Sequence, residues 1–298
     1  MKKRYITLCN SEKYVKGTLV LYESLKATNT GIPLVVFCPK KTPKSVIETL
    51  KSYAKLCNEN PCGLEIMESE EDVTLPDELT RNNKWVRWNG TFDKLLVFGL
   101  TAYDKLIFVD SDMLVLNNLD SLFDYPHLSA SCDGQYCKDD LNSGLMVIEP
   151  TKDKKEMTRI MSYISEVVHN LQFGDQDIIR LAYPQWKISK DLHLSEQYNL
   201  FFENAPKKKK ELGYDITTGA EKPIYIIHFI GYDKPWYTGN GMKWKIYNIT
   251  WKTKMCLRGR IEYKNSIAEK ILRKYHHYLR IVNRKLKSLN ITIHEMNG

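Results

Sequence analysis

Two aspartates separated by one residue give the sharpest chemical signal in this sequence of 298 residues. Asp110 and Asp112 flank Ser111 and follow the largely apolar run 105–109, which is typical of a strand buried on both faces. Carboxylates at the end of a buried strand cost several kcal/mol per ion unless a partner neutralises them. A hard divalent cation would be such a partner, and it would also bind two phosphate oxygens of a diphosphate. The alternative is a turn in which the aspartates cap a helix.

A histidine and a lysine further along the chain could complete such a site. His228 follows the apolar residues 224–227, so a second strand end could supply a nitrogen ligand beside the two carboxylates. Taken alone, a histidine in an apolar stretch is more often a buried core residue. Lys234 comes six residues later, after a glycine turn at Gly231, and could place its charge on a leaving phosphate.

Alternating strand-like and helix-like patterns predict the frame that would position these residues. Their order is a strand at 5–8, a helix at 17–27, a strand at 34–37, a helix starting near 42–43 with Thr42 as its cap and Pro43 in its first turn, a helix at 91–103 and a strand at 105–109. This βαβ order predicts an α/β fold built on a doubly wound sheet. Ligands in such folds collect at the carboxyl ends of the strands, where Asp110 would lie.

Four ordered segments resemble the motifs of glycosyltransferase family 8, most closely those of its glycogenin branch. They are residues 110–112, the turn 142–144, residues 174–176 and residues 228–236. Further similarity lies at 13–26, 92–95 and 118–123. The resemblance covers roughly residues 4–240.

The resemblance implies a GT-A, Rossmann-like fold with a mixed, mostly parallel central sheet in a single catalytic domain. That domain would occupy residues 1–250, with a nucleotide-sugar-binding half at 1–115 and an acceptor and metal half at 116–250. The resemblance also implies a UDP-sugar donor, Mn²⁺ as the cofactor with Mg²⁺ as an alternative, and retention of configuration at the anomeric carbon. Glucose is the first expectation for the transferred sugar, and galactose is the second.

The resemblance further implies roles for individual residues. The metal ligands would be Asp110, Asp112 and His228, with Ser111 between the aspartates. The diphosphate would contact Lys234 and the backbone at Gly231. The residues around the transferred sugar would be Lys94, Asp133, Asn142, Asp175 and Gln176, with Ser143 and Gly144 in the same binding turn. The nucleoside would lie near Leu8, Asn10 and Tyr14. The catalytic set would be Lys94, Asp175, Gln176 and Lys234.

Retention of configuration can be reached by two routes. Either a carboxylate acts as nucleophile in two displacements, or the acceptor attacks from the face that the leaving group vacates. Asp175 is the candidate nucleophile by motif. Its expected role is a hydrogen bond to the sugar, so we favour attack on the same face.

The acceptor remains open among a glycan, a protein, a polyol and a lipid-linked sugar. After 198–200, where glycogenin carries the tyrosine that it glucosylates on itself, this chain has no tyrosine until Tyr214. Glycogenin-like self-priming at this segment is therefore not predicted. The lysine run 207–210 is expected to be a solvated loop, and the resemblance places that segment near the acceptor side.

Residues 251–298 are expected to form a separate, basic, amphipathic helical tail. They contain 12 Lys or Arg and three Glu, a net +9 in a chain of net +8, so the first 250 residues sum to −1. An apolar stripe recurs at intervals of three or four residues, at Ile267, Ile271, Tyr275, Tyr278, Val282, Leu286 and Leu289. The tail could attach to an anionic membrane, with about 1 kcal/mol per basic residue. It could equally pack on the catalytic domain or on a second copy of the chain, in a homodimer.

Composition argues against other classes of protein. The nearly neutral body lacks the basic face that nucleic acid requires. The seven cysteines form no metal-binding framework, and no apolar run suits a signal peptide or a membrane span, so we expect reduced thiols and a cytoplasmic protein. Two alternatives remain: a nucleotide-sugar-binding protein without turnover, and a membrane-surface or nucleic-acid-binding protein acting through the tail.

Overall fold

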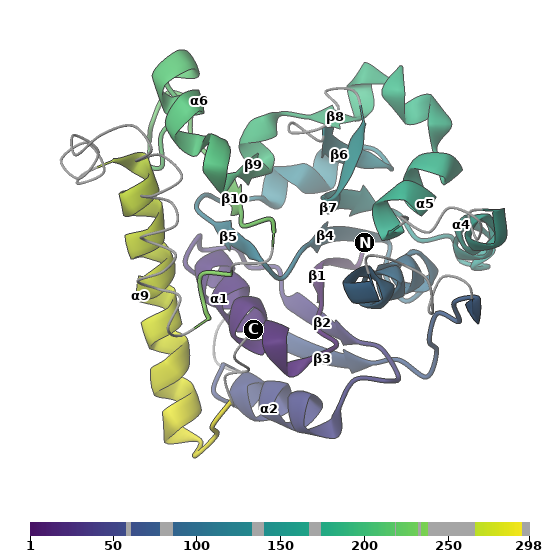
Figure 1. Cartoon of the computed structure of the whole chain (residues 1–298), viewed down its shortest axis with the longest axis horizontal. Helices are drawn as coiled ribbons and strands as arrows, with labels where there is room; N and C mark the ends of the chain where they lie inside the picture. Colours follow the sequence, from purple (N-terminus) through teal and green to yellow (C-terminus); the bar gives the residue numbers. More distant parts are fainter. Residues whose placement is uncertain are drawn as a thin grey trace. The chain divides into compact units, whose positions relative to one another are not determined.

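The structure is a computed structural model that describes residues 1–57, 61–77, 86–132, 140–166, 174–217, 219–231, 234–237 and 266–293 (Figure 1). The chain forms two compact units, each assembled from separate stretches of sequence. The first unit consists of residues 1–10, 31–110 and 120–196. The second consists of residues 11–30, 111–119 and 197–298.

A seven-stranded sheet forms the centre of the first unit, in the order β3-β2-β1-β4-β7-β6-β8. Its strands are β1 (Lys3–Leu8), β2 (Leu34–Cys38), β3 (Leu64–Glu68), β4 (Lys105–Val109), β6 (Ser129–Cys132), β7 (Leu141–Ile148) and β8 (His193–Leu194). Strand β7 runs antiparallel to both of its neighbours, and the other pairings are parallel. The predicted mixed, mostly parallel sheet is therefore confirmed.

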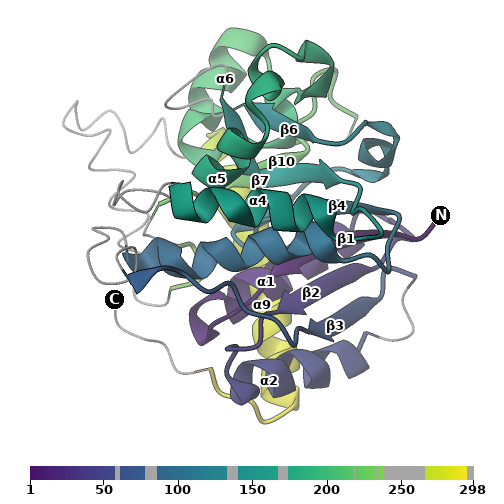
Figure 2. The same cartoon turned by 90° about the vertical axis from the view of Figure 1, so that its right-hand side faces the viewer.

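Three helices cover one face of this sheet, as Figure 2 shows. They are the 3₁₀ helix η1 (Val86–Gly99), α4 (Lys155–Glu166) and α5 (Asp175–Ala182). Their apolar side chains, including Phe98, Ile160 and Ile178, form one buried core with Phe108 and Met146 of the sheet. Helix α2 (Lys44–Lys55) packs against β3. The short 3₁₀ helices of this unit are η2 (Asp120–Asp124), η3 (Pro184–Lys187) and η4 (Lys190–Leu192).

Three predicted helix boundaries were wrong. The helix expected at 91–103 ends at Gly99, where a Cβ would collide with the Met157 side chain of α4, so the glycine allows close packing of the two helices. Helix α2 begins at Lys44, because Pro43 is extended, with φ −56° and ψ 139°, and caps the helix from outside. The helix expected at 17–27 begins earlier, as described next.

The second unit is built around a small three-stranded sheet in the order β5-β10-β9. Strand β10 (Ile226–His228) pairs antiparallel with β5 (Met113–Val115) and parallel with β9 (Leu200–Phe201). Helix α1 (Glu12–Lys26) packs on β5 and begins five residues before the predicted start. The 3₁₀ helices η5 (Glu196–Tyr198) and η6 (Phe202–Asn204) flank β9 along the chain.

The lysine run was expected to be a loop, and that expectation was wrong. Residues 207–210 lie in helix α6 (Ala205–Leu212), whose Pro206 occupies the first turn. Gly213 ends the helix in the left-handed region, with φ +76°. Lys209 pairs with Asp215 beyond that turn, so at least one lysine of the run serves the local fold.

The basic tail contains helix α9 (Ile267–Ser288), which runs beside α1 (Figures 1 and 2). Six of the seven predicted stripe residues are buried, and Leu289 is half-buried. Burial of each large apolar side chain contributes about 1.5–3 kcal/mol. Where α1 contacts α9, Glu23 of α1 is buried. It pairs with Lys26 at 2.7 Å and with Lys285 of α9 at 2.8 Å.

These contacts bear on the two alternatives for the tail. The apolar stripe packs inside the second unit, so only the outer, basic face of α9 remains for an anionic surface. None of the helices in the described part of the chain is both long and apolar enough to cross a membrane.

Candidate active site

A buried lysine between two carboxylates forms the centre of the candidate site in the first unit. Lys94, on η1, lies with its Nζ 3.0 Å from Oδ1 of Asp110 and 2.9 Å from Oδ2 of Asp175. Asp110 directly follows β4, and its backbone N–H donates to the carbonyl of Gly144 on β7 at 2.9 Å. Asp175 is the first residue of α5. The end of β4, the start of α5 and η1 therefore bring three of the predicted residues together.

Electrostatics hold this triad in its charged form. Burial alone would lower the pKa of Lys94, but the charges of Asp110 and Asp175 outweigh burial and hold that pKa above its usual range. Burial likewise opposes ionisation of Asp175, yet Lys94 and hydrogen bonds from Thr91 and Ser143 keep its pKa below the ordinary value. One ammonium thus faces two carboxylates, so the triad carries a net negative charge.

An amide and hydroxyl network extends the triad along β7 and the first turn of α5. Ser143 Oγ donates to Asp175 Oδ2 at 2.8 Å. Asn142 Nδ2 and the Ser143 backbone N–H both donate to Gln176 Oε1 at 3.0 Å, while Gly144 N–H donates to Asn142 Oδ1. Such fixed donors and acceptors can bind the hydroxyl groups of a sugar. All six sugar-site residues predicted within the described chain belong to this network; Asp133 lies outside the described residues.

Strand β7 reaches this position through an irregularity in the sheet. The pairing of β6 with β7 shifts register between Ala130 and Ser131. Ala130 pairs with Met146, whereas Ser131 pairs with Asn142. A bulge of this kind redirects the side chains that follow it, which lets polar residues 142–144 occupy a strand that is otherwise apolar.

The residues predicted near the nucleoside fall in both units. Leu8 ends β1 and packs against the core of the first unit. Asn10 Nδ2 donates to the Gly90 carbonyl at 2.9 Å and lies 3.4 Å from Oδ2 of Asp93. In the second unit, Tyr14 contacts Trp236 edge-on, with ring centroids 6.1 Å apart. The described contacts define no base-binding pocket, so the role of these three residues stays a prediction.

The candidate site in the second unit is centred on Asp112. Its Oδ1 lies 3.2 Å from Nε2 of His228, and its Oδ2 accepts a hydrogen bond from Lys234 Nζ at 2.6 Å. Register positions His228 for this contact, because it pairs with Met113, the residue after Asp112. Burial opposes ionisation of Asp112, but the charges of Lys234 and His228 hold its pKa well below its usual range.

Asn199 fixes the orientation of the histidine. His228 Nδ1 lies 2.9 Å from Asn199 Oδ1, an acceptor, so the Nδ1 atom carries the proton in this arrangement. The Nε2 lone pair of a neutral His228 would then face a carboxylate oxygen. Two lone pairs at this separation repel unless a cation or a proton lies between them. The pair is thus built either for an imidazolium or for a metal ion.

Lys234 is tied into the backbone of the same unit. Its Nζ also donates to the carbonyl of Phe229 at 2.7 Å, and the Phe229 backbone N–H donates to the carbonyl of Asp112 at 3.0 Å. Gly231 lies between Phe229 and Lys234 along the chain. Its φ of +91° is a conformation that favours glycine. The predicted glycine turn therefore places Lys234 beside Asp112.

Gly17 of α1 packs where no side chain fits. A Cβ there would lie 2.8 Å from the carbonyl oxygen of Ser111 and 2.8 Å from the Trp236 ring. Trp236 cannot easily move aside, because its Nε1 donates to the Lys13 carbonyl at 2.7 Å. We expect Gly17→Ala to destabilise the protein by about 1–3 kcal/mol, less the small helix-propensity gain of alanine. A thermal melt checks this against Gly31→Ala, where a Cβ meets nothing within 4 Å; equal melting temperatures for the two variants would contradict it.

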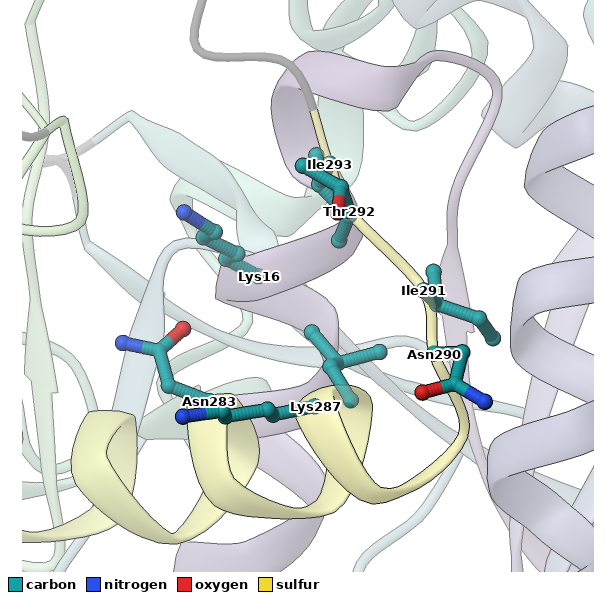
Figure 3. Close-up of a pocket in the computed structure, with 8 residues that line it drawn as sticks. Lys16, Asn283, Lys287, Asn290, Ile291, Thr292 and Ile293 are labelled. Atoms are coloured by element: carbon teal, nitrogen blue, oxygen red, sulfur yellow. The ribbon is translucent and has the colours of Figure 1, made fainter.

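A cavity of about 640 Å³ in the second unit contains none of the predicted site residues (Figure 3). It is lined by Lys16 of α1 and, around the end of α9, by Asn283, Leu286, Lys287, Asn290, Ile291, Thr292 and Ile293. We assign it no part in the candidate site.

Sequence reasoning missed two polar residues of the site. Thr91 hydrogen-bonds to Asp175 in the first unit, and Asn199 holds His228 in the second. No spacing or motif signals either of them, because each acts only through a contact across the fold.

The sheet topology and the two strand-end sites define a GT-A glycosyltransferase fold. Solved structures share it: GlyE of Streptococcus pneumoniae aligns with a TM-score of 0.54 at 19% identity, over 83% of this chain and 61% of GlyE. The galactosyltransferase LgtC aligns with a TM-score of 0.52 at 16% identity, over 78% of this chain and 90% of LgtC.

The chain belongs to glycosyltransferase family 8, whose family model matches residues 5–139 and 131–239. Human glycogenin-1 is 30% identical over 238 residues, which are 78% of this chain and 61% of that protein. UDP-glucuronate:xylan alpha-glucuronosyltransferase 2 of Arabidopsis thaliana is 29% identical over 238 residues, 79% of this chain. The match spans only about a third of that plant protein, 36% of its length. The predicted fold and family are confirmed.

Proposed function

We propose that this chain is a retaining, metal-dependent glycosyltransferase that moves a hexose from a UDP-sugar to an acceptor. The observation that carries the proposal is the environment of Asp112, which contacts both His228 and Lys234 directly after the strand end at Asp110. When UDP departs from the sugar, negative charge develops on its diphosphate, and a catalyst must place positive charge there. Asp112 would anchor both sources of that charge, a metal and a lysine.

The residues present fit a hard divalent cation. Asp112 and His228 offer ligand atoms 3.2 Å apart, close to the roughly 3.0 Å that separates adjacent ligands of an octahedral ion with bonds of about 2.1 Å. Asp110 is two residues from Asp112, so chain geometry limits their Cα separation to about 7.6 Å. We infer that Asp110, Asp112 and His228 hold the ion, with Mn²⁺ preferred by resemblance and Mg²⁺ as the alternative. The ion would supply Lewis-acid stabilisation of the leaving diphosphate.

Lys234 would also stabilise the negative charge that develops on the diphosphate. Its ammonium is held by Asp112 and the Phe229 carbonyl, so it is already fixed near the site. A lysine anchored in this way needs only a small shift to meet a phosphate oxygen. Backbone at Gly231, in its left-handed turn, is the companion contact that the resemblance implies.

The state of Asp175 favours attack from the vacated face. Its Oδ2 accepts from Lys94 at 2.9 Å and from Ser143 at 2.8 Å, and its pKa is lowered. A carboxylate oxygen with two donors is a poor nucleophile, because attack would have to break both contacts. We therefore assign Asp175, with Gln176 and Asn142, to the hydroxyl groups of the sugar.

The decisive experiment measures UDP release from a panel of UDP-sugars with Mn²⁺, together with the intact mass of the protein. Glucose and galactose come first in the panel, and glucuronate is included because the plant relative's name specifies it. We expect one donor to be turned over, and an Asp110→Ala, Asp112→Ala double variant to be silent. Binding of UDP without release from any donor would support a nucleotide-sugar-binding protein instead. A mass increase of one hexose would reveal self-glycosylation.

A further inference from the structure

A cysteine and a histidine meet at the edge of the large sheet in the first unit. Cys132 ends β6 and is half-buried, and its Sγ lies 3.7 Å from Nδ1 of His193 on β8. Strands β6 and β8 are parallel neighbours with Ala130 beside His193, so the register of the sheet brings the two residues together. Cys132 is a thiol and not half of a disulfide. An imidazole nitrogen beside a thiol is the arrangement that activates cysteine as a nucleophile.

The other ring nitrogen of His193 decides which nitrogen can act as a base. His193 Nε2 lies 2.8 Å from the carbonyl oxygen of Trp186. A carbonyl oxygen only accepts, so Nε2 carries a proton, and Nδ1 of the neutral ring presents its lone pair to the thiol. If the thiol proton moves to Nδ1, both N–H groups still have an acceptor, namely the carbonyl and the thiolate. The pair can therefore hold either charge state without rearranging.

The indole of Trp186 supports the charged form of the histidine. The two rings are stacked, with centroids 3.9 Å apart and planes 20° from parallel. Trp186 is itself fixed, because it is 2% exposed and its Nε1 donates to the Leu128 carbonyl at 3.0 Å. The face of an indole attracts a cation. Stacking therefore orients the imidazole and stabilises it once it is protonated.

The neighbouring charges along the chain give the thiolate no net help. Asp140 precedes Leu141, the partner of Cys132 in β7, and it pairs with Lys187 at 2.6 Å. Lys190 and Asp191 of η4 are both exposed to solvent. These four charges sum to zero, so among the described residues His193 is the group that can activate the thiol.

Cys132 differs in this respect from the other described cysteines. Cys9, Cys38, Cys57 and Cys62 are buried. Burial also raises the pKa of the Cys38 thiol, which keeps it neutral and unreactive. In the described part of the chain, only Cys132 combines partial exposure with a histidine base.

We propose that Cys132 is a covalent modification site with His193 as its base, and that small-molecule disulfides are the reagents it takes up. His193 Nδ1 accepts the Sγ proton, and the thiolate attacks one sulfur of the disulfide. A bond forms between Sγ and that sulfur, the original S–S bond breaks, and the leaving thiolate takes the proton from the imidazolium. The disulfide is itself the oxidant. The inference is independent of the proposed function, because neither residue belongs to the candidate active site.

Reaction of the purified protein with oxidised glutathione at pH 7 tests the proposal. Peptide mass spectrometry follows each cysteine separately. We expect a mixed disulfide at Cys132 and none at Cys38. His193→Phe keeps a ring to stack on Trp186 but removes the base. Since an ordinary thiol is only a few per cent ionised at pH 7, this variant should be modified at Cys132 about ten-fold more slowly than the wild type.

The same comparison at about pH 9.5 separates activation from access, because an ordinary thiol is then largely ionised without a base. The difference between wild type and His193→Phe should disappear there. Equal rates at pH 7 would overturn the proposal, and so would a ten-fold difference that persists at the higher pH. A variant that fails to fold would react faster at Cys132 and would also be modified at Cys38, which is the opposite of the expected result.

Discussion

Asp112→Asn should reduce kcat/KM for the UDP-sugar about 1000-fold or more. Asparagine keeps the shape of the side chain but removes the charge that holds His228 at 3.2 Å and Lys234 at 2.6 Å. The variant would lose a metal ligand and misplace the lysine in one change. Steady-state UDP release at saturating Mn²⁺ measures the effect.

The same substitution should lower stability at pH 7 by about 3–5 kcal/mol, since it strips a buried pair of its negative partner. Because the folded pKa of Asp112 is depressed, its contribution is present above the ordinary aspartate range and is lost only as pH falls through that lowered pKa. The stability difference between wild type and variant should therefore persist down to mildly acidic pH. Asp215→Asn is the control, because Asp215 also pairs with a lysine, Lys209. Both side chains of that pair are more exposed to solvent than those of Asp112 and Lys234. Full activity in Asp112→Asn would exclude our metal assignment.

Lys94→Met should have the largest effect in the first unit. Methionine keeps the stem of the side chain but leaves Asp110 and Asp175 facing each other without the ammonium 3.0 and 2.9 Å away. Removing one partner of a buried ionic cluster costs about 3–5 kcal/mol. We expect a correspondingly lower melting temperature at pH 7 and turnover below about 1% of wild type, measured on the UDP-sugar that the panel identifies.

The pH dependence gives Lys94→Met a signature of its own. In the wild type the lowered pKa of Asp175 means that acidification from pH 7 to pH 5 brings no gain in stability. Without Lys94, burial and mutual repulsion raise the carboxyl pKa values, so the variant should become more stable as pH falls over the same range. Lys105→Met is the matched control, because Lys105 is also buried but meets a single, half-exposed carboxylate, that of Glu149. A Lys94→Met variant that melts alike at pH 5 and pH 7 would contradict the triad.

Periodicity predicted the core of the fold because burial leaves a direct trace in sequence. The apolar runs at 34–37 and 105–109 are central strands, and the stripe from Ile267 is the inner face of a helix. Periodicity could not identify what covers that helix, because an apolar stripe that packs on α1 and one that lies on a lipid surface have the same sequence pattern. It also gave no sign that β7 runs antiparallel, which depends on how the connecting chain returns.

The residues of the site differ in the same way: some can be recognised in the sequence, whereas others belong to the site only because of how the chain packs. Asp110, Asp112 and His228 stand out because charged or ligating groups follow apolar strands. Lys94 was assigned by family resemblance alone, and nothing in its neighbourhood predicts that it would be buried between two carboxylates. Asn199 was invisible as a site residue, because its contact with His228 joins positions far apart in sequence.

The chain passes from one unit to the other at five points along its length, and one of them lies within the acidic triplet. No continuous stretch of the gene encodes either half, so recombination cannot exchange one half for that of a relative by a single crossover at each end. A change that is to affect one unit alone must therefore be made at several separate stretches of the sequence.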